Sequence, residues 1–117
     1  MAVPIIYGIA NCDTVKKARR WLDDHLVKHQ FHDFRRDGLT AAQLEDWFAK
    51  VELEVLLNKR SRTWRELNEN NKSNVTQAKA IKLMLDQPSL IKRPVLVMGT
   101  QIMIGFDPAH YESMFVK

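Results

Sequence analysis

An almost uninterrupted apolar run, Val3–Ile9, lies near the start of the sequence and leaves few choices of fold. Such a run is typical of a central strand that is covered on both faces of a sheet. The polar residues Cys12, Asp13 and Thr14 follow at once and are suited to begin a helix. A buried strand that leads directly into a helix predicts an α/β domain.

Apolar residues then recur at Val15, Ala18, Leu22 and Leu26, which predicts one buried stripe along a helix. Residues 30–36 alternate phenylalanine with polar neighbours and predict a short, more exposed strand. A strand–helix–strand order implies a right-handed crossover between two parallel strands.

Residues from about 38 to 90 are expected to be mainly helical. The expected helices run over Thr40–Val51, about Thr63–Glu69 and Val75–Asp86, with a polar loop at 68–74. The first begins with a capping-box pattern of Thr40 and Gln43. The last is expected to bury Val75, Ala78, Ile81 and Leu85.

The C-terminal part predicts two strands and a helix. Pro94–Met98 and Ile102–Ile104 are apolar, and Gly99-Thr100 between them fits a two-residue hairpin. Asp107-Pro108 is a helix-start pattern. The whole order, β-α-β and then β-β-α with a helical insertion over about 38–90, predicts a mixed four-stranded sheet of thioredoxin-like fold. With 117 residues, we expect residues 1–117 to form a single domain.

Cys12 is the sole cysteine of the sequence, so an intrachain disulfide is excluded. At the N-terminus of a helix, unpaired N–H groups would stabilise a thiolate, and Lys16 and Lys17 would add positive charge. This placement favours a reactive thiol, although Cys12 could instead be a small core residue. Because the chain has no second cysteine, redox chemistry at Cys12 would need a sulfur from another molecule.

Arg93-Pro94 opens the second strong strand. Proline is compatible with the first position of a strand, and an X–Pro bond can also be cis, which would expose backbone to a ligand beside Cys12. Arg93 would then bind an anion, unless it is an ordinary surface arginine.

A basic group stands in the middle of the chain: Lys59, Arg60, Arg62 and Arg65, with Trp64 among them. It could form the rim of an anion pocket or be a solvated loop with the tryptophan packed on the core. The net charge of +4 suits a small anion, and we find no nucleic-acid-binding motif.

The spacing of His25, His29 and His32 gives little support for a metal site, because no glutamate completes a metal-binding pattern. The N-terminal run lacks the basic start of a signal peptide, and no segment approaches a membrane span of about 20 residues. We therefore expect a cytoplasmic protein without metal, membrane or nucleic-acid partners.

Three segments, YGIANCDTVKKAR at 7–19, LLNKRSRTWREL at 56–67 and KRPVLV at 92–97, resemble the ArsC-like family. This family includes arsenate reductases, Spx transcriptional regulators and YffB-type proteins, and the segment GFDPAHYESMF is most similar to the YffB type. The resemblance implies a thioredoxin-like fold with a helical insert, a catalytic Cys12 and a cis Pro94.

The sequence departs from the arsenate reductases at the positions that the resemblance makes important. Where they carry histidine and serine, this chain has Gly8 and Val15. The arsenate reductases hold their oxyanion with three arginines. Arg93 matches one of them, Asn58 stands in the place of a second, and residues 101–105, where the third is expected, contain no arginine. Val15 also stands where many Spx proteins have the second cysteine of a CxxC switch, which excludes a switch built on that pair.

These observations lead us to expect a YffB-type thiol reductase that acts through a mixed disulfide at Cys12, with glutathione as co-substrate. Glutathione, a small disulfide or oxyanion, or a protein thiol would be its partner. The alternatives are an Spx-like module that binds RNA polymerase and an arsenate reductase. The residues expected to bind substrate are Asn11, Thr14, Lys16, Arg60, Arg93 and Pro94.

Overall fold

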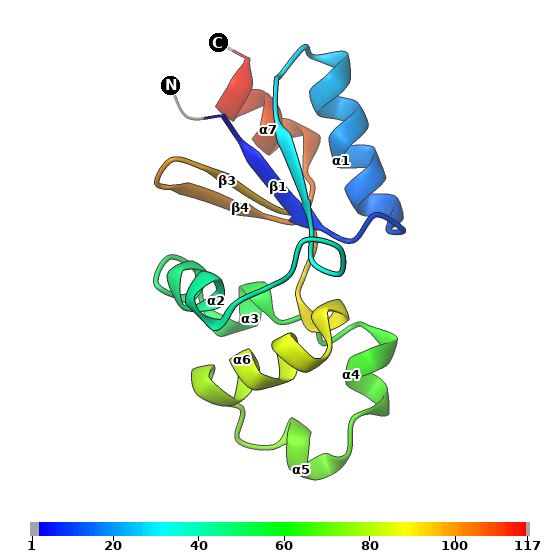
Figure 1. Cartoon of the computed structure of the whole chain (residues 1–117), viewed down its shortest axis with the longest axis vertical. Coiled ribbons are helices and arrows are strands. Elements are labelled where there is room, and N and C mark those ends of the chain that lie inside the picture. The colour runs from blue at the N-terminus through cyan, green and yellow to red at the C-terminus, as the bar shows by residue number, and fades with distance from the viewer. Residues whose placement is uncertain (1–2, 117) are drawn as a thin grey trace. The chain divides into compact units, whose positions relative to one another are not determined.

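The computed structural model describes residues 3–116, which form two compact units. The first unit contains residues up to Gly38 and those from Arg93 onward, and the second is Leu39–Lys92 (Figure 1). Within residues 3–116, no helix combines the length and the apolar character needed to cross a bilayer.

The first unit is built on a four-stranded mixed sheet. Its elements are β1 (Ile5–Gly8), α1 (Asp13–Asp24), β2 (Gln30–Asp33), β3 (Val95–Met98), β4 (Gln101–Ile104) and α7 (Pro108–Phe115). The strand order is β2-β1-β3-β4, with β1 parallel to β2 and antiparallel to β3, and with β3 antiparallel to β4. The predicted fold class is therefore confirmed, and Gly99 turns the hairpin with a φ of 61°.

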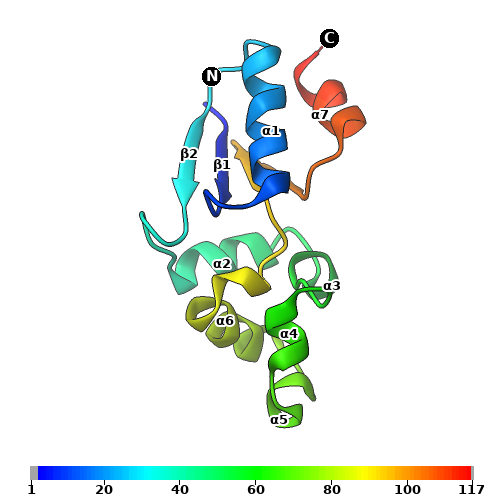
Figure 2. The same cartoon turned by 90° about the vertical axis from the view of Figure 1, so that its right-hand side faces the viewer.

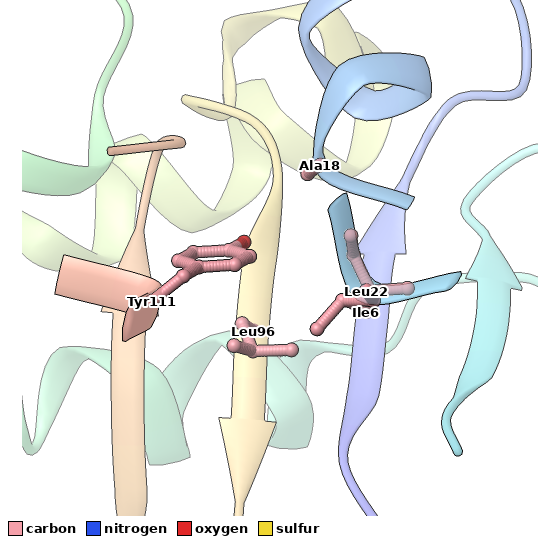
Figure 3. Close-up of a cluster of buried hydrophobic side chains, with 5 residues drawn as sticks. All are labelled: Ile6, Ala18, Leu22, Leu96 and Tyr111. Carbon is pink, nitrogen blue, oxygen red and sulfur yellow. The ribbon is translucent and has the colours of Figure 1, made fainter. Parts of the chain in front are cut away.

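The two helices of this unit, α1 and α7, pack on the same face of the sheet (Figure 2). Ile6 from β1 and Leu96 from β3 meet Ala18 and Leu22 of α1 and Tyr111 of α7 in one fully buried cluster (Figure 3). Each large apolar side chain buried in this way stabilises the fold by about 1.5–3 kcal/mol. The cluster fixes α1 over β1, and hence fixes where the helix begins.

The C-terminal end of α1 differs from the sequence prediction. The helix ends at Asp24, and Leu26, expected in the buried stripe, is 92% exposed with a φ of 57°. The Leu26 N–H donates to the Asp23 carbonyl and the Val27 N–H to the Leu22 carbonyl, the two bonds of a Schellman motif. The turn swings Leu26 outward, and Val27 packs against the core in its place.

The second unit is helical. Its elements are α2 (Ala41–Phe48), α3 (Leu53–Leu56), α4 (Arg62–Glu66), α5 (Glu69–Lys72), α6 (Gln77–Asp86) and the 3-10 turn η1 (Pro88–Leu90). The predicted capping box is present, because the Gln43 N–H donates to the Thr40 hydroxyl and the Thr40 N–H to the Gln43 side chain. A bridge pairs Leu57, which follows α3, with Ile91, which follows η1.

Two predictions for this unit are wrong. The stretch 68–74 is not simply a loop, since Asn68 caps the one-turn helix α5 by accepting from the Asn71 N–H. Helix α6 begins after Thr76 and buries Ala80, Ile81 and Met84, whereas Val75, Ala78 and Leu85 are not buried. Both sets of residues fit a helical repeat, and packing against α2 and η1 selects the face that contains Met84.

Candidate functional site

Cys12 is the N-cap residue of α1, and three residues separate it from Gly8, the last residue of β1. Its backbone is extended, with φ −140° and ψ 120°, and its carbonyl accepts the first helical hydrogen bond from the Lys16 N–H at 2.9 Å. The residue is half-buried. The thiol therefore lies at a helix N-terminus, where N–H groups have no partner within the helix.

The surroundings of Cys12 favour the thiolate. Burial alone raises the pKa of the thiol, but hydrogen bonds from the Val15 N–H, the Arg93 guanidinium and the Thr14 N–H, together with the charge of Arg93, outweigh it. The pKa of Cys12 consequently lies below its ordinary value. Lys16, expected to help, has an exposed side chain and is not among the groups that lower this pKa.

The pairing of β3 with β1 places Arg93 and Pro94 near the strand end that leads to Cys12. In the antiparallel register of β1 and β3, Tyr7 pairs with Val95, so residues 93 and 94 come beside the end of β1 that leads to Cys12. The Arg93-Pro94 peptide bond is cis, which confirms that prediction. Pro94 is buried, and its carbonyl accepts from the Gly105 N–H at 2.8 Å.

Gly8 and Val15 form a close contact beneath the first turn of α1. A Cβ atom at Gly8 would lie 2.7 Å from Cγ2 of Val15, a distance that real Cβ atoms do not show. Val15 is fully buried, so it has no room to move aside. The glycine thus lets the helix that carries Cys12 approach β1, and a side chain at position 8 is incompatible with valine at position 15.

The remaining predicted residues fall into two sets. Asn11 and Thr14 flank Cys12 and are exposed, as is Lys16 one turn further on. Arg60 belongs to the second unit, where it is exposed and, with Lys59 and Lys92, lines a pocket of about 300 Å³. A role for Arg60 in binding the substrate of Cys12 stays a prediction.

The rest of the basic group makes contacts of its own. The Lys59 ammonium lies 5.5 Å from the centre of the Trp64 ring, and Arg62 donates to Glu66 at 2.9 Å. Arg65 is exposed, and its carbonyl accepts from the ammonium of Lys72.

The histidines do not form the spacing on one helix that a metal site would use, because α1 ends before His25. The rings of His25, His29 and His32 instead hydrogen-bond the carbonyls of Trp21, Val27 and Gly38. Within residues 3–116, no group of three or more histidine, cysteine or carboxylate side chains could hold a metal ion.

Asp33, at the end of β2, is a neighbour of the site that the sequence analysis did not single out. Its side chain is buried and accepts a hydrogen bond from the Ala10 N–H, in the loop that leads to Cys12. A local signal was present, because an aspartate that follows a strand often bonds the backbone N–H two residues on. The link to Ala10 had no signal in the sequence.

The strands form a mixed sheet of order β2-β1-β3-β4, a cysteine with a lowered pKa lies at the start of α1, and a cis-proline precedes β3. These features define a thioredoxin-like protein with a single cysteine at its site. The model of the ArsC family matches residues 7–114. The chain therefore belongs to the ArsC family.

Comparison with individual proteins agrees with this assignment. An uncharacterised protein of Haemophilus influenzae is 43% identical, and the match covers 94% of this chain and 96% of that protein. The solved structure of a protein named YFFB is 45% identical with a TM-score of 0.91, covering 94% of this chain and 96% of that one. An arsenate reductase-related protein from Brucella melitensis is 49% identical with a TM-score of 0.79, covering 100% and 97%.

Transcriptional regulators are more distant relatives. The regulatory protein MgsR of Bacillus subtilis is 26% identical, and the match covers 95% of this chain and 89% of that protein. The chain is thus similar both to a protein named for arsenate reduction and to a protein named for regulation.

Proposed function

We propose that this protein is a thiol reductase of the YffB type that uses Cys12 as its nucleophile and glutathione as co-substrate. The observation that carries the proposal is the lowered pKa of Cys12, caused by the helix N–H groups and Arg93. A thiolate is the form of cysteine that attacks disulfides. Because the chain has no other cysteine, the reducing thiol has to come from a second molecule.

The proposed reaction has two exchange steps. In the first, the Cys12 thiolate attacks the glutathione sulfur of a mixed disulfide, so that a Cys12–glutathione disulfide forms and the substrate leaves as a thiolate. In the second, the thiolate of another glutathione attacks that sulfur, releasing oxidised glutathione and restoring the Cys12 thiolate. Overall one reduced glutathione is consumed: its sulfur joins the glutathione sulfur of the mixed disulfide as oxidised glutathione, and the substrate sulfur is released as a thiolate.

The roles proposed for the other site residues follow from charge and exposure. Arg93 would bind a carboxylate of glutathione, since guanidinium groups form paired hydrogen bonds with carboxylates. Asn11, Thr14 and Lys16 would contact the peptide from the exposed side, and Pro94 would present backbone. No metal is needed. We also propose a single thioredoxin-like domain in the cytoplasm, where free thiols are kept reduced.

Arsenate reduction is a second candidate, favoured by the 49% identity to the arsenate reductase-related protein. An oxyanion with several negative charges needs several cations around it, and Arg93 is the one arginine that this chain offers at the expected positions. Gly8 packed against Val15 also leaves no space for the histidine expected in arsenate reductases. We therefore rank this activity below thiol transfer.

A regulatory module that binds RNA polymerase is the third candidate, and the similarity to regulators such as MgsR favours it. It differs from an enzyme in needing no exchange at Cys12. A pull-down with the polymerase α subunit tests it directly.

The thiol-transfer proposal is tested with a glutathionylated peptide, reduced glutathione and a coupled assay of oxidised glutathione. We expect turnover by the native protein, none by Cys12→Ser, and one glutathione bound per chain when reduced glutathione is omitted. Arsenate in the same assay should give much slower turnover. Retention of the polymerase subunit without any mixed disulfide would replace the enzyme proposal by the regulatory one.

A further inference from the structure

Asp33 is the one buried charged side chain within residues 3–116, with 7% of its surface exposed. A buried charge is costly unless hydrogen bonds compensate it. All the bonds of this carboxylate come from backbone N–H groups, and they connect two segments that are distant in the sequence.

The two carboxylate oxygens serve different segments. Oδ1 accepts from the Arg35 N–H at 2.8 Å and the Arg36 N–H at 3.3 Å, in the turn that follows β2. Oδ2 accepts from the Ala10 N–H at 3.0 Å, in the loop between β1 and α1. Asp33 therefore joins the end of β2 to a residue that lies two positions before Cys12.

The turn that carries Asp33 is itself fixed. The Phe34 N–H donates to the Gly8 carbonyl at 2.8 Å, and the Asp37 N–H donates to the Asp33 carbonyl at 2.7 Å. The Asp33 N–H in turn donates to Oδ2 of Asp37. The carboxylate thus projects from a hydrogen-bonded turn, which suits it to hold the neighbouring loop in place.

The position of the loop between β1 and α1 matters because the groups that stabilise the Cys12 thiolate act only at short range. The N–H groups of Val15 and Thr14 and the guanidinium of Arg93 lower the pKa of the thiol, so their effect depends on where the sulfur lies. A shift of the Ala10–Cys12 segment would move the sulfur relative to these groups, and charge-assisted interactions weaken with distance and with angle.

We propose that Asp33 is a positioning residue, whose bond to the Ala10 N–H holds Cys12 where the helix N–H groups and Arg93 stabilise its thiolate. This inference rests on the proposed use of that thiolate. The negative charge of Asp33 would by itself disfavour a nearby thiolate. Its benefit is therefore geometric. Loss of the bond to Ala10 should raise the pKa of Cys12, whereas loss of the negative charge alone would lower that pKa.

The test is Asp33→Asn, with the pKa of Cys12 measured from the rate of alkylation by iodoacetamide against pH. An amide has one oxygen, so it cannot accept from both Ala10 and the Arg35–Arg36 turn. We expect the pKa of Cys12 to rise, with alkylation slowed at least about threefold below that pKa. Amide hydrogen exchange at Ala10 and Asn11 should become faster.

Asp37→Asn is the matched control. Asp37 lies in the same turn and accepts from the Asp33 N–H, but its other contact is with Arg36 rather than with the loop. The variant makes the same carboxylate-to-amide change four residues away. Because the amide oxygen can still accept from the Asp33 N–H, the variant should leave the pKa of Cys12 unchanged, even where loss of the ion pair with Arg36 lowers the melting temperature.

If Asp33→Asn does not fold, Asp33→Ser provides the same test, because a serine hydroxyl can still bond the Arg35 N–H but is too short to reach Ala10. An unchanged or lowered pKa of Cys12 in the folded variant would overturn the proposal. Alkylation requires no glutathione. If the native protein shows no thiol transfer, the proposed function is refuted, but the effect of Asp33 on the pKa of Cys12 is unaffected by that result.

Discussion

The chemistry at Cys12 depends strongly on Arg93, because among the residues that the structure describes it is the one side chain that lowers the pKa of the thiol. The helix N–H groups belong to the backbone and are present in any variant that keeps α1. Arg93 combines a hydrogen bond with a positive charge, and it lies beside Cys12 through the pairing of β3 with β1.

We expect Arg93→Ala to raise the pKa of Cys12 and to weaken glutathione binding, because both depend on the guanidinium. The free energy of unfolding should change little by comparison, since the side chain is not fully buried. Alkylation rate against pH gives the first quantity and urea denaturation the last. Lys16→Ala, which removes an exposed charge one turn away, is the control and should leave the pKa unchanged. Lower stability with unchanged glutathione affinity would mean that Arg93 is structural.

Among the elements, helix α1 positions Cys12. The residues at its two ends adopt conformations and contacts that the helical pattern of the sequence does not predict. At its start, Gly8 permits the close approach to β1. At its end, Leu26 adopts the left-handed conformation that glycine usually occupies.

Gly8→Ala should lower the free energy of unfolding by about 1–3 kcal/mol, because the new methyl group overlaps Val15. Val15→Ala leaves a small cavity and is also destabilising on its own. The double variant should be less destabilised than the two single losses added, since each change makes room for the other. Strictly additive losses in urea denaturation would show that the two residues do not share this contact.

Leu26→Gly should stabilise the protein by about 0.5–1 kcal/mol, because glycine tolerates the positive φ without steric cost. Leu26 is almost fully exposed, so its side chain contributes little packing that could be lost. Leu26→Ala is the control: it keeps a Cβ atom in the left-handed conformation and should give no such gain. Equal melting temperatures for the glycine and alanine variants would contradict this explanation.

For the molecule as a whole, acid sensitivity is a consequence of the buried carboxylate. Burial raises the pKa of Asp33, but hydrogen bonds from the N–H groups of Arg35, Ala10 and Arg36 outweigh it, so the pKa lies below its ordinary value. In the unfolded chain the group titrates near about 3.9. The stabilisation is therefore complete above that pH and is lost as the pH falls through the lower pKa of the folded state.

We expect the contribution of Asp33 to the free energy of unfolding to be nearly constant above about pH 5 and to fall below about pH 4. Urea denaturation at several pH values measures this. Asp33→Asn should be less stable near neutral pH and should lose less stability on acidification than the native protein. An identical loss in both proteins would show that Asp33 is not the group responsible.

The sequence predicted the parts of the fold whose signals are local. The run at β1, the hairpin at Gly99 and the helix start at Asp107 each depend on neighbouring residues, and each is present. The one-turn helices α3 and α5 were missed, because four residues are too few to show a repeat.

The candidate site was predicted to the same extent. Cys12 and Arg93-Pro94 carry recognisable chemistry, so they could be found without a structure. Asp33 could not, because its partner Ala10 is 23 positions away and contributes a backbone N–H that any residue except proline would supply. Leu26 was misplaced because the helical repeat continues in the sequence beyond the point where the helix ends.

If Cys12 is held as a thiolate, the alkylation rate of the native protein measured against pH will show it. We expect a single titration with a pKa clearly below the free-thiol value of about 8.5, and no alkylation in Cys12→Ser. Slow alkylation with an unshifted or raised pKa would contradict it, and would make Cys12 a buried structural residue.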